Sequence, residues 1–205
     1  MIKNVIFDIG NVIAYYKHED VINRFAKTEE EKKFIMDNIV NSPEWAGYGL
    51  VDIGFLTWDE IIKTIQDRTN HIHDDLVEKY CHEHYNYLDV QNKMLSLIKD
   101  LIVRGYKVYL LSNTNEDATN HLRKSELFDI VHGYVLSHEI HQIKPYTSIY
   151  KTLINKYNLK KEESLFVDDR LDNCETAKSL GIDYINVLPD NYDDLINKLT
   201  KKVNL

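Results

Sequence analysis

The sequence predicts an α/β protein, in which an open, doubly wound parallel sheet carries an inserted α-helical cap. Three observations support this fold class. Short apolar runs without polar alternation are typical of strands that are buried on both faces. Helical segments separate the later runs, as the right-handed crossovers of a parallel sheet require. A long stretch with helix signals and no convincing strand interrupts the pattern directly after the first run.

The predicted strands are short and apolar. They are VIF at 5–7, VYLL at 108–111, LFV at 165–167 and YINVL at 184–188. A helix is expected before the second of them, because apolar residues recur at helical spacing from Met94 to Ile102. Arg104 followed by Gly105 is a basic last turn with a glycine in the C′ position, which predicts the end of this helix.

The interruption is predicted to be a helical cap. Capping boxes, in which Thr28 precedes Glu31 and Thr57 precedes Glu60, mark two helix starts, and a third helix is expected over 74–85. The predicted domains are a core of residues 1–14 and 90–205 and a cap of residues 15–89. In an open sheet the ligand crevice lies outside the carboxyl ends of the strands. A cap inserted after the first strand is therefore expected to cover that crevice as a lid.

Composition restricts the partners. The formal net charge of −8 over 205 residues disfavours nucleic acid and anionic membrane surfaces, but it permits a small anionic substrate in a cleft. No apolar run reaches membrane-spanning length, and the chain enters a strand at once, so neither a membrane span nor a signal peptide is expected. Cys81 and Cys174 form no CxxC motif, which indicates reduced thiols and a cytoplasmic protein.

Polar residues with chemical potential follow the predicted strands. They are Asp8, the pair Ser112 and Asn113, Lys144 before a proline, and the pair Asp168 and Asp169. Each has an ordinary explanation as a turn residue or a helix cap. Since the carboxyl ends of parallel strands meet at one edge, all of them are expected to converge on a single crevice.

Phosphoryl transfer fits this set. A carboxylate can attack phosphorus and form an aspartyl phosphate. Mg²⁺ takes oxygen ligands and needs only one or two carboxylates besides phosphate and water. A hydroxyl and backbone amides can hold phosphate oxygens near a helix N-terminus, and a lysine can neutralise the transferred group. The P-loop and GxGxxG dinucleotide motifs are both absent from the sequence.

The order of these segments resembles the haloacid dehalogenase-like (HAD) hydrolase superfamily over the whole chain. FDIGNV, LLSNTN, IKP and FVDDRLDN resemble its four motifs in the right order, and the insert resembles its helical C1 cap. The resemblance implies a Rossmann-like core and a small phosphorylated substrate. It also implies residue roles: Asp8 as nucleophile and Mg²⁺ ligand, Ser112 and Asn113 as phosphate-binding residues, Lys144 as the motif lysine, Asp169 as the direct metal ligand, and Asp168 and Asn173 as residues that reach the metal indirectly.

One position departs from the superfamily pattern. Most of its phosphatases carry a second aspartate, a general acid/base, two residues after the nucleophile, whereas this chain has Gly10, whose carbonyl can still serve the metal. This form resembles a subgroup of small-sugar-phosphate phosphatases that includes α-D-glucose-1-phosphate phosphatase. We expect good leaving groups, such as sugar 1-phosphates or aryl phosphates, to compensate for the missing acid. Water or a cap residue such as Tyr15, Tyr16 or His18 is an alternative donor.

The function predicted is a Mg²⁺-dependent phosphatase acting on a small phosphorylated metabolite, a sugar phosphate, through an aspartyl-phosphate intermediate. A dehalogenase-type hydrolase and a non-catalytic binding protein stay open as alternatives. Histidines and a cysteine form a competing zinc pattern, but closely spaced residues of this kind more often lie on a solvated face. These residues are His71, His73, Cys81, His82, His84, His138 and His141. Aromatic residues of the insert are expected in the cap core, namely Trp45, Tyr48, Phe55 and Trp58.

Overall fold

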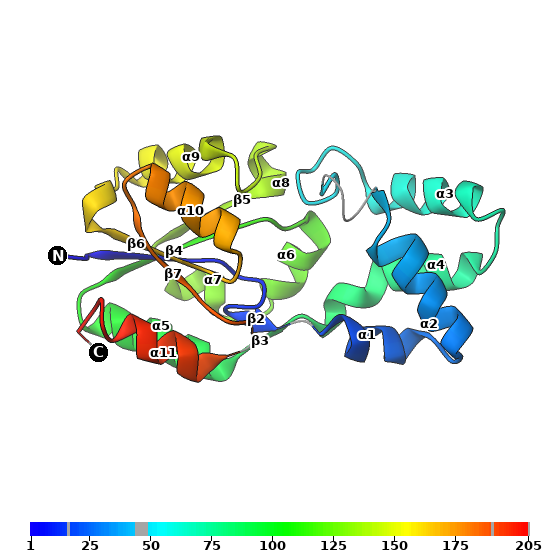
Figure 1. The fold of residues 1–205 in the computed structure, drawn as a ribbon, viewed down its shortest axis with the longest axis horizontal. Coiled ribbons are helices and arrows are strands. Elements are labelled where there is room, and N and C mark those ends of the chain that lie inside the picture. The colour runs from blue at the N-terminus through cyan, green and yellow to red at the C-terminus, as the bar shows by residue number, and fades with distance from the viewer. Residues whose placement is uncertain (16, 44–48, 190, 205) are drawn as a thin grey trace.

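The computed structural model describes residues 1–15, 17–43, 49–189 and 191–204. Its main element is a five-stranded parallel sheet with the strand order β5-β4-β1-β6-β7 (Figure 1). The predicted fold class is confirmed by this sheet and the helices that flank it. The strands are β1 Asn4–Phe7, β4 Lys107–Ser112, β5 Gly133–Leu136, β6 Ser164–Asp168 and β7 Asp183–Asn186.

Helices cover both faces of the sheet, which is why the strands are apolar throughout. In β1, Val5 and Phe7 belong to one hydrophobic cluster and Ile6 to another, since successive side chains of a strand point to opposite faces. Figure 1 shows α5 and α11 on one face and α9 and α10 on the other. These helices are α5 Asn92–Val103, α11 Tyr192–Leu199, α9 Thr147–Tyr157 and α10 Leu171–Ser179.

The central strand sets the place of the crevice. Phe7, at the end of β1, pairs with Leu110 of β4 on one side and with Val167 of β6 on the other. The chain therefore builds the sheet outward from β1 in both directions, with β4 on one side and β6 on the other. This makes the end of β1 a topological switch point, and ligands bind at such a point, outside the carboxyl ends of the strands. Short helices follow β4 and β5 at this edge. They are α6 Glu116–Leu122, α7 Leu127–Ile130 and α8 Ser137–Ile140.

The two segments that connect the sheet to the helical insert lie side by side. Ala14–Tyr15 (β2) pairs in antiparallel fashion with Asp89–Val90 (β3). The prediction that the insert contains no strand is wrong at this point, because pairing between residues so distant in sequence leaves no local signal. Both predicted domain boundaries fall within the β2–β3 ladder, and the division into core and cap stays a prediction.

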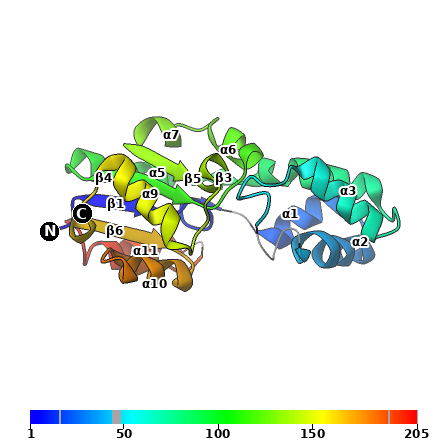
Figure 2. The same ribbon diagram turned by 90° about the horizontal axis from the view of Figure 1, so that it is seen from above.

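The insert is otherwise helical, and its helices gather beyond one end of the sheet (Figure 2). Both predicted capping boxes are present, so the starts predicted at Thr28 and Thr57 are confirmed. These helices share a hydrophobic cluster of their own, which includes Ile35, Ile61 and Tyr80. The elements are α1 His18–Phe25, α2 Glu29–Ile35, the π-helical turn Met36–Val40, α3 Trp58–Arg68, α4 Asp74–Glu83 and the 3₁₀ turn His84–Tyr87.

Two strands differ from their predictions. β5 was not predicted because it is a short edge strand whose first two residues, Gly133 and Tyr134, are only half-buried. β7 ends at Asn186 rather than at residue 188, and Leu188 is exposed. Within the described parts of the chain, no helix is both long enough and apolar enough to cross a membrane.

Candidate active site

Asp8 follows β1 directly and lies at the crevice. Its backbone amide donates to the carbonyl of Val167 at 2.9 Å, which extends the β1–β6 ladder by one residue. Its Oδ1 atom accepts a hydrogen bond from the amide of Ile9 at 2.7 Å. The residue is buried, yet it lines a cleft of about 590 Å³. The first strand therefore ends in a carboxylate that is held at one oxygen and faces a cleft.

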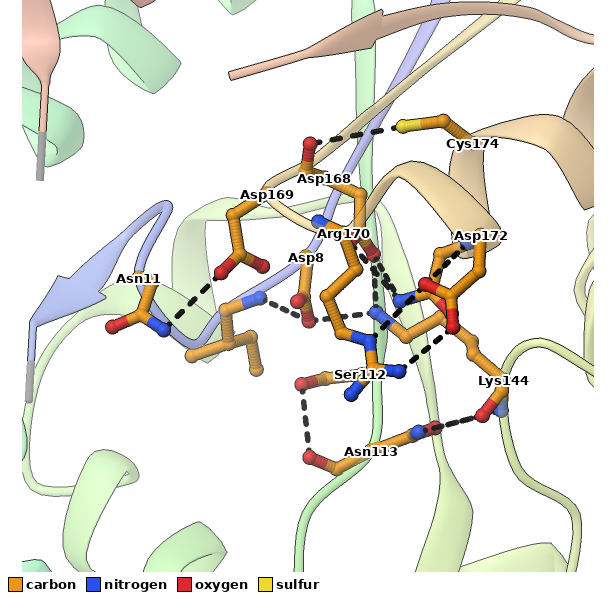
Figure 3. Close-up of polar contacts among 12 residues, drawn as sticks. Asp8, Asn11, Ser112, Asn113, Lys144, Asp168, Asp169, Arg170, Asp172 and Cys174 are labelled. Carbon is orange, nitrogen blue, oxygen red and sulfur yellow. Dashed lines mark hydrogen bonds and ion pairs between the residues drawn. The ribbon is translucent and has the colours of Figure 1, made fainter. Parts of the chain in front are cut away.

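Lys144 is the counter-ion of this carboxylate. Its Nζ atom lies 2.9 Å from Oδ1 of Asp8 and 2.7 Å from Oδ2 of Asp168 (Figure 3). Only 3% of Lys144 is exposed, so the ammonium group is almost entirely withdrawn from water. Asn113 fixes the backbone of this lysine, because its side-chain amide donates to the carbonyl of Lys144 at 2.9 Å and accepts from its N–H at 2.8 Å. The lysine is thus positioned between two acidic strand ends.

Asp168 is fully buried, and both of its carboxylate oxygens are occupied. The side-chain amide of Asn173 donates to Oδ1 and to Oδ2, each at 3.0 Å, and the backbone amide of Arg170 donates to Oδ1 at 2.8 Å. Together with Lys144, these donors bind the carboxylate from several sides, so Asp168 holds the residues of the site in place. Asp168 is not among the described residues that line the cleft.

Asp169 differs from its neighbour because it is half-buried and lines the cleft. The described contact of its carboxylate is a hydrogen bond of 3.2 Å from the side-chain amide of Asn11 to Oδ2. Asn11 reaches it from a turn in which its φ angle is +57°, a left-handed conformation that asparagine tolerates. One carboxylate oxygen each from Asp8, Asp168 and Asp169 lie within 4.8 Å of one another.

The charges of this cluster do not balance. Three carboxylates share one lysine, so a net negative charge is withdrawn from water. Burial, opposed by Lys144 and reinforced by Asp168, raises the pKa of Asp8 to about 6. Burial and then Asp168 also raise the pKa of Asp169. Burial by itself would lower the pKa of Lys144, but Asp168 and Asp8 outweigh it and the pKa lies above its ordinary value. A divalent cation with oxygen ligands fits this surplus of negative charge.

Ser112 and Asn113 lie at the end of β4, as predicted, beside the same crevice. Ser112 is buried, and its hydroxyl makes a long hydrogen bond of 3.5 Å to the carbonyl of Asn113. The side chain of Asn113 is engaged with the backbone of Lys144, although the residue lines the cleft. The group of Asn113 that is available to contact phosphate is therefore its backbone amide. Sequence reasoning missed this positioning role, since an asparagine after a strand has no signal for its partner.

Gly10 lines the cleft beside Asp8. A Cβ atom built on Gly10 would meet no atom within 4 Å, so the surrounding structure would leave room for a side chain at this position. Two of the suggested replacement donors, Tyr15 and His18, are not among the described residues that line the cleft, and Tyr16 lies outside the described residues.

The predicted solvated histidines divide into two groups. His71 and His82 are exposed and lie beside carboxylates, Asp74 at 2.9 Å and Asp59 at 3.3 Å. His84 is buried and stacks on Tyr80 with ring centroids 5.4 Å apart, and Cys81 is buried as well, so the prediction of a solvated face is wrong for both. Among the described residues, the group with metal-ligand geometry is the aspartate cluster.

The aromatic residues of the insert also divide. Trp58 is buried in the cap cluster, as predicted. Phe55 is 61% exposed and stacks on His141 of the core at 5.4 Å, so its assignment to the cap core is wrong. Trp45 and Tyr48 lie outside the described residues.

The doubly wound sheet presents a carboxylate, a buried lysine and an aspartate pair at its carboxyl edge, a set of groups typical of a hydrolase site. Residues 2–181 match the family model of the haloacid dehalogenase-like hydrolases, and the chain belongs to that family. The predicted family and the predicted enzyme class are confirmed.

Three similar proteins give this family membership more detail. A D-ribitol-5-phosphate phosphatase of Bacteroides thetaiotaomicron is 27% identical over the full length of both chains. A sesquiterpene phosphatase of Aspergillus oryzae is 24% identical over 88% of this chain and 87% of its own. A crystal structure of a HAD family enzyme from Bacteroides thetaiotaomicron, in complex with magnesium and inorganic phosphate, is 26% identical. It covers 95% of this chain and 99% of its own, with a TM-score of 0.75. The predicted cofactor, Mg²⁺, agrees with that complex.

Proposed function

We propose that this chain is a Mg²⁺-dependent phosphatase that hydrolyses a small phosphorylated metabolite, a sugar or polyol phosphate, through an aspartyl phosphate on Asp8. The observation that carries the proposal is the buried Lys144, shared between Asp8 and Asp168 beside an aspartate that lines the cleft. A lysine in this place holds Asp8 as a carboxylate and offsets the charge of an incoming phosphoryl group.

Each residue of the site has a proposed role. Asp8 attacks phosphorus, and its carboxylate is directed by the amide of Ile9 and by Lys144. The hydroxyl of Ser112 and the backbone amides at Ser112 and Asn113 hold phosphate oxygens. The ligands proposed for Mg²⁺ are Asp8, Asp169 and the backbone carbonyl of Gly10, while Asp168 and Asn173 position this group. When bound, the cation neutralises negative charge on the phosphoryl oxygens.

The lining of the cleft favours a polar substrate. Besides Asp8 and Lys144, the polar side chains that line the cleft are those of Asn11, Asp52, Asn113, Asp169, Arg170 and Asn173, and Ile143, Pro145 and Tyr146 line it as well. A sugar or polyol phosphate presents hydroxyl groups that can pair with such side chains, whereas a terpenyl chain would leave them without partners. The volume of about 590 Å³ lies within the usual range for small-molecule sites. These properties support a substrate closer to that named for the ribitol-phosphate relative than to that named for the sesquiterpene relative.

A panel assay tests the proposal. The protein is incubated with sugar and polyol phosphates, aryl phosphates and 2-haloacids, each with Mg²⁺ and with a chelator. We expect phosphate release that depends on Mg²⁺ and no halide release. Halide release without metal would instead establish the dehalogenase alternative, and inertness toward every compound would favour the binding protein.

Asp169→Asn and Asp168→Asn should fail in different ways. Asp169→Asn is expected to weaken Mg²⁺ activation by more than the roughly 10- to 100-fold typical of a residue that only supports a ligand, because it removes a charged ligand that lines the cleft. Asp168→Asn should weaken Mg²⁺ activation less but destabilise the fold more, because it removes the charge that pairs with the buried Lys144. Magnesium titrations of turnover and urea unfolding without metal measure the two effects. If Asp168→Asn has the larger effect on Mg²⁺ activation, the direct ligand is Asp168.

A further inference from the structure

The departing alkoxide of a phosphate monoester needs a proton, and general acid help is worth about 10²–10⁴ in rate. Gly10 has no side chain to supply it. A side chain that donates this proton would have to come from another part of the cleft wall. Among the described residues of the helical insert, the carboxylic acid that lines the cleft is Asp52, in the loop that precedes α3.

The core holds this loop in place. Ser137 of α8 donates its hydroxyl to the carbonyl of Asp52, and His141 contacts the carbonyl of Ile53 through Nδ1 at 2.9 Å. The loop also approaches α8 closely at Gly54, where a Cβ atom would lie 2.8 Å from the carbonyl oxygen of His138. These contacts fix Asp52 as part of the wall of the active-site cleft.

The carboxyl group of Asp52 is only partly engaged. The side-chain amide of Asn115, from the segment after β4, donates to Oδ1 at 3.2 Å. Among the described residues, Oδ2 has no hydrogen-bond partner. Burial raises the pKa of Asp52 to about 6, and the hydrogen bond from Asn115 opposes this rise. The group is thus an acid poised closer to neutrality than an ordinary aspartate, which suits proton transfer.

We propose that Asp52 is the general acid that Gly10 lacks, and that it protonates the leaving oxygen of the substrate from the cap side of the cleft. This inference rests on the proposed phosphatase function. It assigns a catalytic role to a residue that no motif marks, and it places the acid on a different segment of the chain from the nucleophile.

The chemistry balances over two steps. An Asp8 oxygen forms a bond to phosphorus while the bond from phosphorus to the ester oxygen breaks, and the electron pair stays on that oxygen. The oxygen takes the proton of Asp52, so the alcohol leaves and Asp52 becomes a carboxylate. In the second step, water attacks phosphorus and releases its proton to solvent, and Asp52 takes up a proton from solvent. The bond to Asp8 then breaks, which releases phosphate and restores both aspartates.

The pH dependence has a defined sign. Asp52 must be protonated at the start of the first step, so turnover of esters with poor leaving groups should fall as pH rises through the pKa of Asp52. Several titratable or charged groups face Asp52 or its loop. They are His138 of α8 and His141 directly after it, Glu116 and Asp117 of α6, and Asp8, Lys144, Asp169 and Arg170 around the cleft. Asp52→Asn removes the titrating group, so it should remove this limb of the profile.

The test compares leaving groups with the Mg²⁺-loaded enzyme. Turnover is measured for a series from 4-nitrophenyl phosphate, whose leaving group needs no proton, to alkyl phosphates such as glycerol and ribitol phosphates. Asp52→Asn should lower kcat for the alkyl esters by about 10²- to 10⁴-fold and hardly change it for the aryl ester. The matched control is Asp75→Asn, at an exposed aspartate of the cap outside the cleft lining, which should retain the wild-type series.

Gly10→Asp provides a rescue experiment, since a side chain at residue 10 has room. In the double variant Gly10→Asp/Asp52→Asn, restored turnover of alkyl esters would support the assignment.

The inference is overturned if Asp52→Asn hydrolyses alkyl esters at the wild-type rate. It is also overturned if the variant loses rate equally for aryl and alkyl esters, which would make Asp52 a residue that positions the loop. A steep leaving-group dependence in the wild type itself would favour compensation by the leaving group. If the wild type hydrolyses no ester in the series, the proposed function itself fails.

Discussion

Asp8→Asn is expected to reduce phosphate release to background while the protein stays folded. An amide has nearly the shape of the carboxylate, but it is a poor nucleophile, and removal of a catalytic nucleophile costs up to about 10⁶ in kcat. The contacts of Asp8 with Ile9 and with Lys144 show that its carboxylate is already directed and paired. The measurement is phosphate release from an aryl phosphate with saturating Mg²⁺, together with the circular dichroism spectrum.

The control for this variant is Asp183→Asn. Asp183 begins the edge strand β7, at the end of the strand away from the crevice, and forms an exposed ion pair of 2.6 Å with Lys202. It should retain wild-type turnover. Phosphate release by Asp8→Asn well above background would exclude Asp8 as the nucleophile.

Lys144→Met is expected to be the most destabilising single substitution in the site. Methionine has a similar length but no charge, so the buried carboxylates of Asp8 and Asp168 would lose their cation. Removal of one partner of a buried ion pair costs about 3–5 kcal/mol. Urea unfolding without Mg²⁺ measures the free energy of unfolding, and turnover should be lost as well because the phosphoryl group loses its lysine.

Lys202→Met is the matched control, since it breaks an exposed pair that contributes about 0–1 kcal/mol. The double variant Lys144→Met/Asp168→Asn should recover part of the loss, because it removes one of the carboxylates left without a cation. If Lys144→Met unfolds at the wild-type urea concentration, the lysine contributes no net stability and its role is confined to the reaction.

The elements that sequence reasoning predicted are those with local signals. The capping boxes at Thr28 and Thr57 need only residues three positions apart, and the apolar runs of β1 and β6 follow from burial on both faces. The β2–β3 ladder was missed because its partners lie about 75 residues apart, and β5 because an edge strand needs less apolar sequence.

Part of the site was accessible from the sequence for a topological reason. Parallel strands bring their carboxyl ends to one edge, so polar residues that follow apolar runs converge there. Asp8, Lys144, Asp168 and Asp169 do lie together in the structure. The contacts that each of these residues makes could not be predicted from the sequence. That the side chain of Asn113 holds the backbone of Lys144 depends on a side-chain orientation that residue type alone does not specify.

The sequence by itself determined the class of fold, the residues gathered at the sheet edge and the absence of an acid at Gly10. Only the tertiary structure decided where a replacement acid stands. Asp52 belongs to no motif and follows Asp8 by more than forty residues of helical insert, so neither spacing nor periodicity links the two. They share a cleft because Ser137 and His141 hold the Asp52 loop against the core. Such contacts between distant segments follow from packing of the whole chain, which no local pattern encodes.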